Sequence, residues 1–372
     1  MYINFWYAAT TSESVADTPL RVRMLGQDFV LFRDSSGAIA CLADTCIHRG
    51  ASLGHGKVKD GCIQCPYHGW RFDRDGRCTL IPSLGAGARI PARARVDAYP
   101  VVERYGLVFA FLGDLSEEQR PPIVEIPEWN QAGWRTMLYV YDWSAHFQRS
   151  VENSLDAPHV DFVHDFGGLS NTSFKLEPER SVVEERGAWG AVHLIETKTQ
   201  LFEHGHSGVS HTWTWLTFGK APNSPKFLFY TFITPVDETR VRRFLIQARN
   251  VQLDPKVDEQ LRPANDSAER EDRVVIEKLR PAESPTDTQH EFMVADDAIM
   301  VRYRERLREW EQRGWRIDTE AVNRQRQRFA FAIPGPTRRQ GGSWVLDPIP
   351  LRAPDERSSA AWSDSLPSSR FS

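Results

Sequence analysis

Two short segments of the chain carry cysteine and histidine at matching spacing. They are Cys46–Gly50 (CIHRG) and Cys65–Trp70 (CPYHGW). Each offers one thiolate and one imidazole, and the glycine in each lets the backbone fold closely around a metal. Thiolates and imidazoles are the ligands of zinc and of iron–sulfur clusters. The segments therefore predict a metal centre held by Cys46, His48, Cys65 and His68.

The pairing of one cysteine with one histidine in each segment favours an iron–sulfur cluster. In a Rieske [2Fe–2S] centre two cysteines bind one iron and two histidines bind the other, which raises the reduction potential above that of an all-cysteine cluster. A Cys2His2 zinc site more often has its two cysteines close together in the sequence and its two histidines close together. A structural zinc site remains the alternative to the cluster. The other cysteines, Cys41, Cys62 and Cys78, are expected to be small buried apolar residues.

A second group of polar side chains lies in VENSLDAPHVDFVHD, residues 151–165. Asn153, Asp156 and His159 recur at i, i+3 and i+6, so a helix would place them along one face. His164 follows at an awkward helical step, and the proline before His159 predicts a bulge or a helix end. Such residues could form a hydrogen-bonded core cluster. Two histidines and one carboxylate also bind Fe(II) and leave adjacent positions for oxygen and substrate.

Two later segments compete to supply that carboxylate. Asp272 shares a face with Ile276 on one predicted helix, whereas Asp296 and Asp297 lie on another, where Asp296 shares a face with Ile299. An acid on an apolar face is costly unless it is paired or bound to a metal. The residues alone leave both segments open, because acids at the margin of an apolar stripe are common.

The elements that must position these residues fall into two regions. Short strands are predicted at 29–33 and 39–42, with a hairpin at 101–112. Longer strands are predicted at 136–141, 182–198, 208–218, 226–235 and 241–250, with a first helix at 143–165. An antiparallel sheet around a helix is an α+β arrangement. The expected domains are 1–115 for the cluster, 116–134 as a linker, 135–350 for the second metal and 351–372 as a mobile tail.

The composition of the chain limits its expected partners and its expected cellular location. The net charge of −4 gives no overall attraction to nucleic acid or to anionic membranes. No stretch of the sequence is long and apolar enough to predict a membrane span, and the N-terminus does not read as a signal peptide, so a cytoplasmic location is expected. A reducing compartment makes a disulfide framework unexpected. His204, His206 and His211 are interpreted first as ordinary turn or strand-edge histidines and second as pocket lining.

Basic side chains cluster around the two cysteine–histidine segments. A solvated face and a docking surface for an acidic electron donor are equally good interpretations of this cluster. The residues are Arg49, Lys57, Lys59, Arg71, Arg74 and Arg77. The sequence has no Gly-rich dinucleotide motif, so it predicts no nicotinamide-binding site of its own.

The two metal motifs together resemble those of the Rieske non-heme iron oxygenases. CIHRG and CPYHGW resemble the cluster motif of the ring-hydroxylating oxygenase alpha subunit, and ENSLDAPHVDFVH resembles the family's N-x-x-D-x-x-H-x-x-x-x-H iron motif. EDRVVIEKLRP resembles the later segment whose aspartate completes the triad. The resemblance therefore implies Fe(II) held by His159, His164 and Asp272, with Asp297 in reserve. It also implies an N-terminal all-β Rieske domain and a C-terminal helix-grip (START-like) domain.

The resemblance also implies roles for Asp156 and Asn153 in the catalytic site. In this family the acid at the position of Asp156 bridges a cluster histidine of one subunit and an iron-ligand histidine of its neighbour. That implies a homotrimer in which Asp156 contacts His68 across the interface and His159 in its own chain. By the same resemblance, a separate reductase would consume NADH or NADPH, a ferredoxin and/or flavin reductase would pass the electrons to this chain, and O2 would be the co-substrate.

The reaction expected from this resemblance is mono- or dioxygenation of a small aromatic or heterocyclic molecule. O- or N-demethylation, desaturation and amine N-oxygenation start from the same iron chemistry and remain open. A Rieske protein that only transfers electrons is the non-enzyme alternative.

Overall fold

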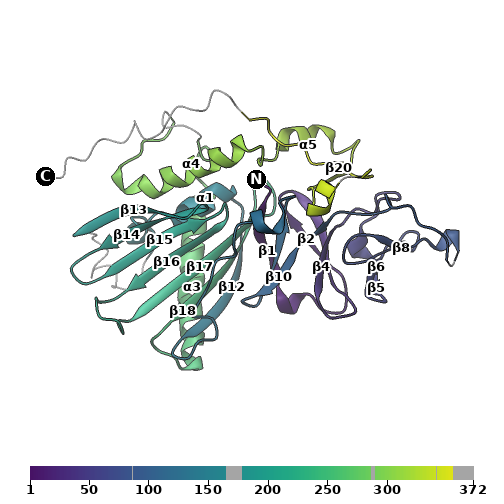
Figure 1. The fold of residues 1–372 in the computed structure, drawn as a ribbon. Coiled ribbons are helices and arrows are strands. Elements are labelled where there is room, and N and C mark those ends of the chain that lie inside the picture. Colours follow the sequence, from purple (N-terminus) through teal and green to yellow (C-terminus); the bar gives the residue numbers. More distant parts are fainter. Residues whose placement is uncertain (86, 165–177, 286–289, 341, 355–372) are drawn as a thin grey trace. The chain divides into compact units, whose positions relative to one another are not determined.

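The computed structural model describes residues 1–85, 87–164, 178–285, 290–340 and 342–354. The chain divides into two compact units (Figure 1). Unit 1 combines residues 1–123, 234–238 and 314–353, and unit 2 combines the described residues of 124–233 and 239–313. The predicted tail, 351–372, lies outside the described residues from 355 onward.

Unit 1 is built mainly from small antiparallel sheets. One has the order β1-β11-β10, with β1 at Phe5–Thr11, β10 at Val101–Arg104 and β11 at Leu107–Leu112. A second has the order β2-β3-β4-β9, with strands Leu20–Met24, Gln27–Arg33, Ile39–Ala43 and Ala98–Tyr99. A third has the order β5-β6-β7-β8, with strands Lys57–Lys59, Cys62–Gln64, Arg71–Phe72 and Cys78–Leu80. The predicted N-terminal β-domain and its closing hairpin are confirmed.

The C-terminal segment 314–353 belongs to unit 1, whereas the sequence had placed residues up to 350 in the second domain. It contains α5 (Thr319–Gln325) and the short parallel pair β19 (Phe331–Ala332) and β20 (Asp347–Pro348). Arg338 donates to both carboxylate oxygens of the buried Asp97 at 2.7 and 2.8 Å, and Tyr99 donates to the Ile333 carbonyl. These long-range contacts explain the difference, because no local sequence pattern reports them.

Unit 2 is a seven-stranded antiparallel sheet with helices packed on it. Its order is β12-β18-β17-β16-β15-β14-β13. The strands are β12 (Arg135–Trp143), β13 (Arg180–Arg186), β14 (Gly190–Glu196), β15 (Leu201–Ser207), β16 (His211–Thr217), β17 (Lys226–Pro235) and β18 (Val241–Arg249). The helices are α1 (Phe147–Ser154), α2 (Val160–Val163), α3 (Pro255–Ile276) and α4 (Ala298–Gln312). The predicted α+β class is confirmed.

Helix α3 is held against the sheet by polar contacts along its length. Asp254 caps its start by accepting from the Lys256 backbone N–H, and a proline occupies the first turn, where it is tolerated. Farther along, Asn265 donates to the Tyr139 hydroxyl of β12 at 2.8 Å, and Glu269 pairs with Arg243 of β18 at 3.1 Å. The register of α3 on the sheet is thereby fixed, and Asp272 follows on the same helix.

Two predicted elements of unit 2 are wrong in detail. The single helix expected over 143–165 is instead the end of β12, then α1, a break at residues 155–159 and the short α2. A proline within the break removes a backbone donor that a continuous helix would need. The long strand expected over 182–198 is the hairpin β13–β14, and β15 was not predicted. In the described part of the chain, no helix combines the length and apolar character needed to cross a bilayer.

Candidate metal centres

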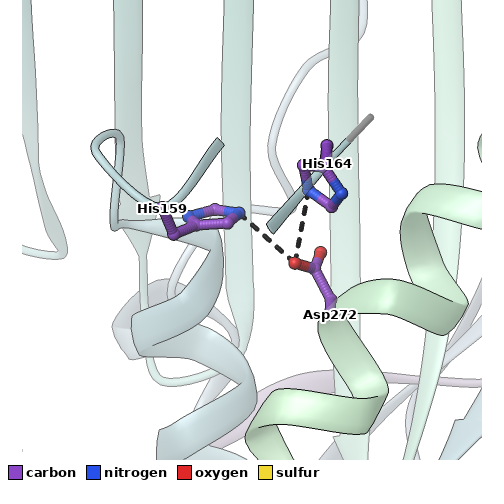
Figure 2. Close-up of side chains that lie close together, drawn as sticks. All are labelled: His159, His164 and Asp272. Carbon is purple, nitrogen blue, oxygen red and sulfur yellow. Dashed lines mark ion pairs between the residues drawn. The ribbon is translucent and has the colours of Figure 1, made fainter. Parts of the chain in front are cut away.

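Three side chains of unit 2 converge on one point. Asp272 Oδ1 lies 3.4 Å from His159 Nε2 and 3.3 Å from His164 Nε2 (Figure 2). One ligand atom from each residue lies within 4.8 Å of the others. His159 immediately precedes α2, His164 immediately follows it and Asp272 comes from α3, so the group joins segments far apart in the sequence. The structure therefore brings together the three residues that the resemblance implied.

The remaining nitrogen of each imidazole is already engaged. His164 Nδ1 lies 3.0 Å from Glu271 Oε2, and His159 Nδ1 contacts the backbone carbonyl of Asp156. A partner on Nδ1 fixes the ring orientation and directs Nε2 toward Asp272, as is usual for metal-bound histidine. Glu271 was missed in the sequence analysis, although it directly precedes Asp272 in the segment that carries the resemblance.

The charges of His159, His164 and Asp272 and their burial favour a bound cation. Asp272 is buried, and its Oδ1 has no hydrogen-bond partner that meets ordinary geometry. Burial alone would raise the pKa of Asp272, but His159 and His164 outweigh it and hold the pKa well below its usual value. An ionised, unsatisfied carboxylate facing two imidazole nitrogens is costly without a counter-ion. The donor set, with two nitrogens and one oxygen, matches the facial triad of non-heme iron.

The other predicted residues of this region lie nearby in different roles. Asn153, on α1, and Asp156, in the break after it, both line the cavity at the three-residue group. Asp156 Oδ1 accepts from the His159 backbone N–H at 3.3 Å, and burial raises the pKa of Asp156. Asp297 is not part of the group, because its carboxylate accepts from the Val294 N–H just before α4. The last residue of the 151–165 stretch lies outside the described residues.

A cavity of about 190 Å³ adjoins the group. Its apolar wall comes from Val160, Phe202, Leu216, Phe229 and Leu245. Its polar wall includes Thr214, Thr231, His204, Asn265 and the Arg243–Glu269 pair. Such a mixture is typical of a small-molecule site, in which a few polar groups orient an otherwise apolar ligand.

His204 belongs to this cavity, contrary to the first interpretation of the three neighbouring histidines. It lies on β15, where Phe202 and His204 occupy alternate positions and both face the cavity. The alternation in LFEHGHS was the available signal, but the intervening glycine and the short length concealed the strand. His206 and His211 are buried and do not line the cavity, so the ordinary interpretation holds for them.

The two cysteine–histidine loops of unit 1 have the same backbone design. Cys46 N–H donates to the Ala51 carbonyl at 2.8 Å, and the Cys46 carbonyl accepts from Gly50 N–H at 2.9 Å. Cys65 N–H likewise donates to the Trp70 carbonyl at 2.8 Å, and the Cys65 carbonyl accepts from Gly69 N–H at 3.1 Å. Both glycines have φ near +70°, at 73° and 70°, which other residues adopt only with strain.

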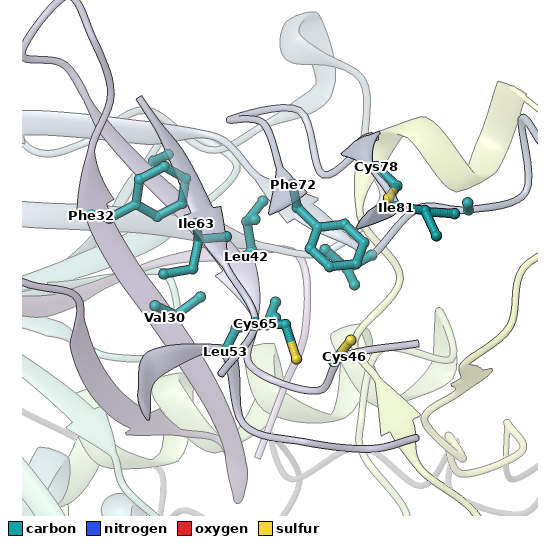
Figure 3. Close-up of a cluster of buried hydrophobic side chains, with 13 residues drawn as sticks. Val30, Phe32, Leu42, Cys46, Leu53, Ile63, Cys65, Phe72, Cys78 and Ile81 are labelled. Atoms are coloured by element: carbon teal, nitrogen blue, oxygen red, sulfur yellow. The ribbon is translucent and has the colours of Figure 1, made fainter. Parts of the chain in front are cut away.

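The four predicted cluster ligands divide into a buried pair and an exposed pair. Cys46 and Cys65 lie at the margin of an apolar core (Figure 3), and both are free thiols. Burial and the neighbouring Cys65 raise the pKa of Cys46 to about 12, so a bound cation is needed to stabilise its thiolate. His48 and His68 are exposed, with ring centroids 4.5 Å apart. Two sulfurs inside and two imidazoles outside fit a Rieske cluster.

Most of the remaining cysteines are buried, and two of the basic residues around the loops form ion pairs. Cys41 and Cys78 are buried as expected, whereas Cys62 is only half-buried. Among the basic residues around the loops, Arg71 pairs with Asp60 at 2.6 Å and Arg74 pairs with Asp34 at 2.6 Å. These pairs reduce the net positive charge of the surface around the loops.

Comparisons with known proteins agree with both candidate metal centres. Residues 5–100 match the Rieske [2Fe-2S] domain family, and residues 143–313 match the vanillate O-demethylase oxygenase C-terminal domain family. The chain is 30% identical to the putative toluene-4-sulfonate monooxygenase iron-sulfur subunit TsaM2 of Comamonas testosteroni, over 79% of this chain and 92% of that protein. It is 28% identical to the dicamba O-demethylase oxygenase component of Stenotrophomonas maltophilia, over 83% and 97%. The structure of Pseudomonas putida CBB5 NdmA with caffeine superposes with a TM-score of 0.70 at 26% identity, covering 83% of this chain and 91% of that one.

Proposed function

The chain belongs to the Rieske non-heme iron oxygenases, and from this premise we propose that it oxidises an uncharged aromatic or heterocyclic molecule beside iron held by His159, His164 and Asp272. The supporting observation is the convergence of these three donor atoms at the wall of a largely apolar cavity. When bound, the [2Fe–2S] cluster supplies single electrons and the mononuclear iron activates O2.

The protein's own residues prepare the site for this chemistry. Glu271 and the Asp156 carbonyl orient the two imidazoles, so that both Nε2 atoms face the Asp272 carboxylate. Phe202, Leu216 and Phe229 hold an apolar ring and exclude water from it. Asn265, held by Tyr139 at 2.8 Å and Gln247 at 3.0 Å, is placed to orient a polar substituent.

The charge of the substrate follows from Arg243. It is the sole lysine or arginine among the described residues that line the cavity. Its guanidinium is already bound by Glu269 at 3.1 and 3.2 Å and by the Ser150 hydroxyl at 2.7 Å. No described basic side chain of the cavity is therefore left to pair with a carboxylate on the substrate, which would be buried beside Asp272 and Glu269 with only the bound iron to offset its charge. An uncharged ring avoids this burial of charge.

The electron path and assembly follow from the family. Cys46, His48, Cys65 and His68 hold the cluster, and a ferredoxin or flavin reductase supplies its electrons. We propose a head-to-tail homotrimer in which Asp156 connects His68 of a neighbouring chain to His159. The five free cysteines support a reducing, cytoplasmic setting.

The outcome of oxidation is hydroxylation or demethylation, depending on which substrate atom faces the iron. Relatives include a methylxanthine N1-demethylase from Pseudomonas putida and an aminopyrrolnitrin oxygenase from Pseudomonas fluorescens. Each of these oxidations requires only that one C–H or N–H group of the substrate lies at the triad.

A matched pair of substrates tests this proposal. Purified protein with a surrogate ferredoxin and reductase would be given methoxybenzene or 4-methoxybenzoate, and phenolic products and formaldehyde would be quantified. We expect kcat/KM to be at least about tenfold higher for the neutral compound, which corresponds to about 1.4 kcal/mol. A preference for the carboxylate would contradict the assignment of an uncharged substrate. Product from neither compound, nor from a panel of neutral methoxy- and N-methyl-arenes, would contradict the proposed substrate class.

A further inference from the structure

Three adjacent strands of unit 2 carry a continuous row of hydrogen-bonded side chains that the proposed iron site does not use. Ser181 lies on β13, His193 on β14 and His204 on β15. Ser181 Oγ lies 2.8 Å from His193 Nε2, and His193 Nδ1 lies 3.0 Å from His204 Nε2. Both nitrogens of His193 are therefore engaged, one on each side.

The strand register explains the row. His193 and His204 are directly paired across β14 and β15, so their side chains lie on the same face of the sheet. Val183 of β13 is paired with His193, and Ser181 is two residues before it, which places Ser181 on that face as well. The row is thus a consequence of sheet geometry and does not depend on a flexible loop.

The two ends of the row lie in different environments. His204 is 1% exposed and lines the cavity together with His159, His164 and Asp272. Ser181 is exposed on β13, the strand at the edge of the sheet. Between them, His193 is 4% exposed. The row therefore connects an exposed hydroxyl at the sheet edge with the cavity through two buried imidazoles.

Imidazole is suited to pass a proton along such a row. A neutral ring carries one donor and one acceptor nitrogen, so it can accept a proton on one side and release one on the other. Burial lowers the pKa of both His193 and His204, which keeps the resting rings neutral. Serine contributes a hydroxyl that both donates and accepts, and solvent can restore its proton.

We propose that Ser181, His193 and His204 form a proton relay from the sheet edge to the oxygen-binding cavity, an inference that rests on the proposed function. Monooxygenation consumes one O2, a pair of electrons and a pair of protons for each hydroxylated product, and the second oxygen atom leaves as water. The electrons arrive from the reductase. The protons need a route into a cavity with an apolar wall, and the row provides one.

Each transfer along the relay is balanced. Ser181 gives its hydroxyl proton to His193 Nε2 and takes one from water. His193 gives its Nδ1 proton to His204 Nε2, and His204 releases its other ring proton into the cavity. Reversal of both tautomers resets the row, and no group gains or loses an electron.

The test compares His193→Gln with His206→Gln. Glutamine can hydrogen-bond to both neighbours, but its amide cannot pass a proton by tautomerisation. His206 lies on the same strand as His204, and its Nδ1 contacts the Gly208 carbonyl outside the row, so it is the matched control. Iron content and the Rieske electron paramagnetic resonance signal would first establish that both variants are loaded and folded.

Two ways of driving the reaction separate proton delivery from other defects. With reductant and O2, we expect product formation by His193→Gln to fall about a hundredfold, in the range for lost proton transfer. With hydrogen peroxide, which brings its own oxygen, electrons and protons, His193→Gln should match the unmodified protein within about twofold. His206→Gln should be unaffected in both assays.

A second readout does not depend on turnover. Neutron diffraction from loaded crystals soaked briefly in D2O would show deuterium on the ring nitrogens of His193 and His204 in the unmodified protein. In His193→Gln, the His204 ring should retain hydrogen. Equal deuterium at His204 in both proteins, or equal losses in the two assays, would overturn the relay and leave the row as a structural contact. If the unmodified protein forms no product in either assay, the proposed function fails instead.

Discussion

The donor residues of the two candidate metal centres are positioned in different ways. In unit 1 the donors come from two short loops closed by their own backbone hydrogen bonds, with the cysteines buried and the histidines exposed. In unit 2 the donors come from α3 and the two ends of α2, and the two imidazoles are oriented by the Glu271 side chain and by the Asp156 carbonyl. A centre that exchanges electrons with other proteins needs an exposed edge, whereas a centre that oxidises a substrate needs an enclosed cavity.

The comparison implies that each centre can be removed without the other. His164→Ala should abolish product formation, because it removes a donor whose place no described neighbour can take. The cluster loops make no use of His164, so the Rieske electron paramagnetic resonance signal should be unchanged. Cys46→Ser is the reciprocal variant and should lose the cluster signal while the mononuclear iron is retained. Loss of both metals in either variant would show that the centres are not independent.

Within unit 2, ion pairs should contribute to stability differently beside the iron site and at the surface. The Arg243–Glu269 pair beside the iron site is buried, with both side chains less than 10% exposed, at 4% and 9%. Glu269→Leu leaves the Arg243 guanidinium without its partner and should cost about 3–5 kcal/mol in the free energy of unfolding. Chemical denaturation followed by tryptophan fluorescence measures this cost. The matched surface pair Arg180–Glu184 has side chains 60% and 40% exposed, and Glu184→Leu should cost less than about 0.5 kcal/mol.

Asp156 tests whether the two centres communicate between chains. Asp156→Asn keeps the size of the side chain and should leave both metals bound. Turnover should fall about 10–100-fold, the range for a group that acts through a metal-bound histidine. Single-turnover oxidation of the reduced cluster measures the electron-transfer step directly. Asp142→Asn, an exposed acid that pairs with Arg242, is the control. Normal cluster oxidation in Asp156→Asn would refute the bridging role.

The smallest effect should come from the cluster loops. Gly69→Ala and Gly50→Ala both place an alanine at positive φ, at 70° and 73°, and each should cost about 1 kcal/mol. A Cβ at Gly69 would also lie 3.2 Å from Pro82 Cγ, whereas one at Gly50 would meet nothing within 4 Å. Thermal unfolding should therefore rank Gly69→Ala as the less stable variant. The reverse order would show that the local loop geometry is not what limits stability.

The same contrast explains what the sequence could predict. Cys46, His48, Cys65 and His68 lie in two short motifs, so their type and spacing suffice to predict a cluster. Sheet strands such as β17 and β18 were predicted from their apolar patterns. The choice of Asp272 over Asp297 came from the family resemblance, because both are acids at the margin of an apolar helix face and the residues alone do not distinguish them. Only the packing of α3 on the sheet brings Asp272 to the two histidines.

Other features depend on contacts that no local pattern reports. The break between α1 and α2 was expected as a bulge or a helix end, but no local pattern indicated that it places the Asp156 carbonyl on His159 Nδ1. His204 and His193 are adjacent through strand register, which requires β15 to be recognised as a strand. The roles assigned to the predicted ligands, to Asp156 and to Asn153 remain predictions.

The most direct test of the account is a metal count on the purified protein and on His164→Ala. The unmodified chain should bind about three irons with acid-labile sulfide, and the variant about two, with identical Rieske electron paramagnetic resonance signals. About two irons in both proteins would show that His164 holds no metal and would favour a protein that only transfers electrons. Zinc in place of iron, in colourless material, would contradict both centres.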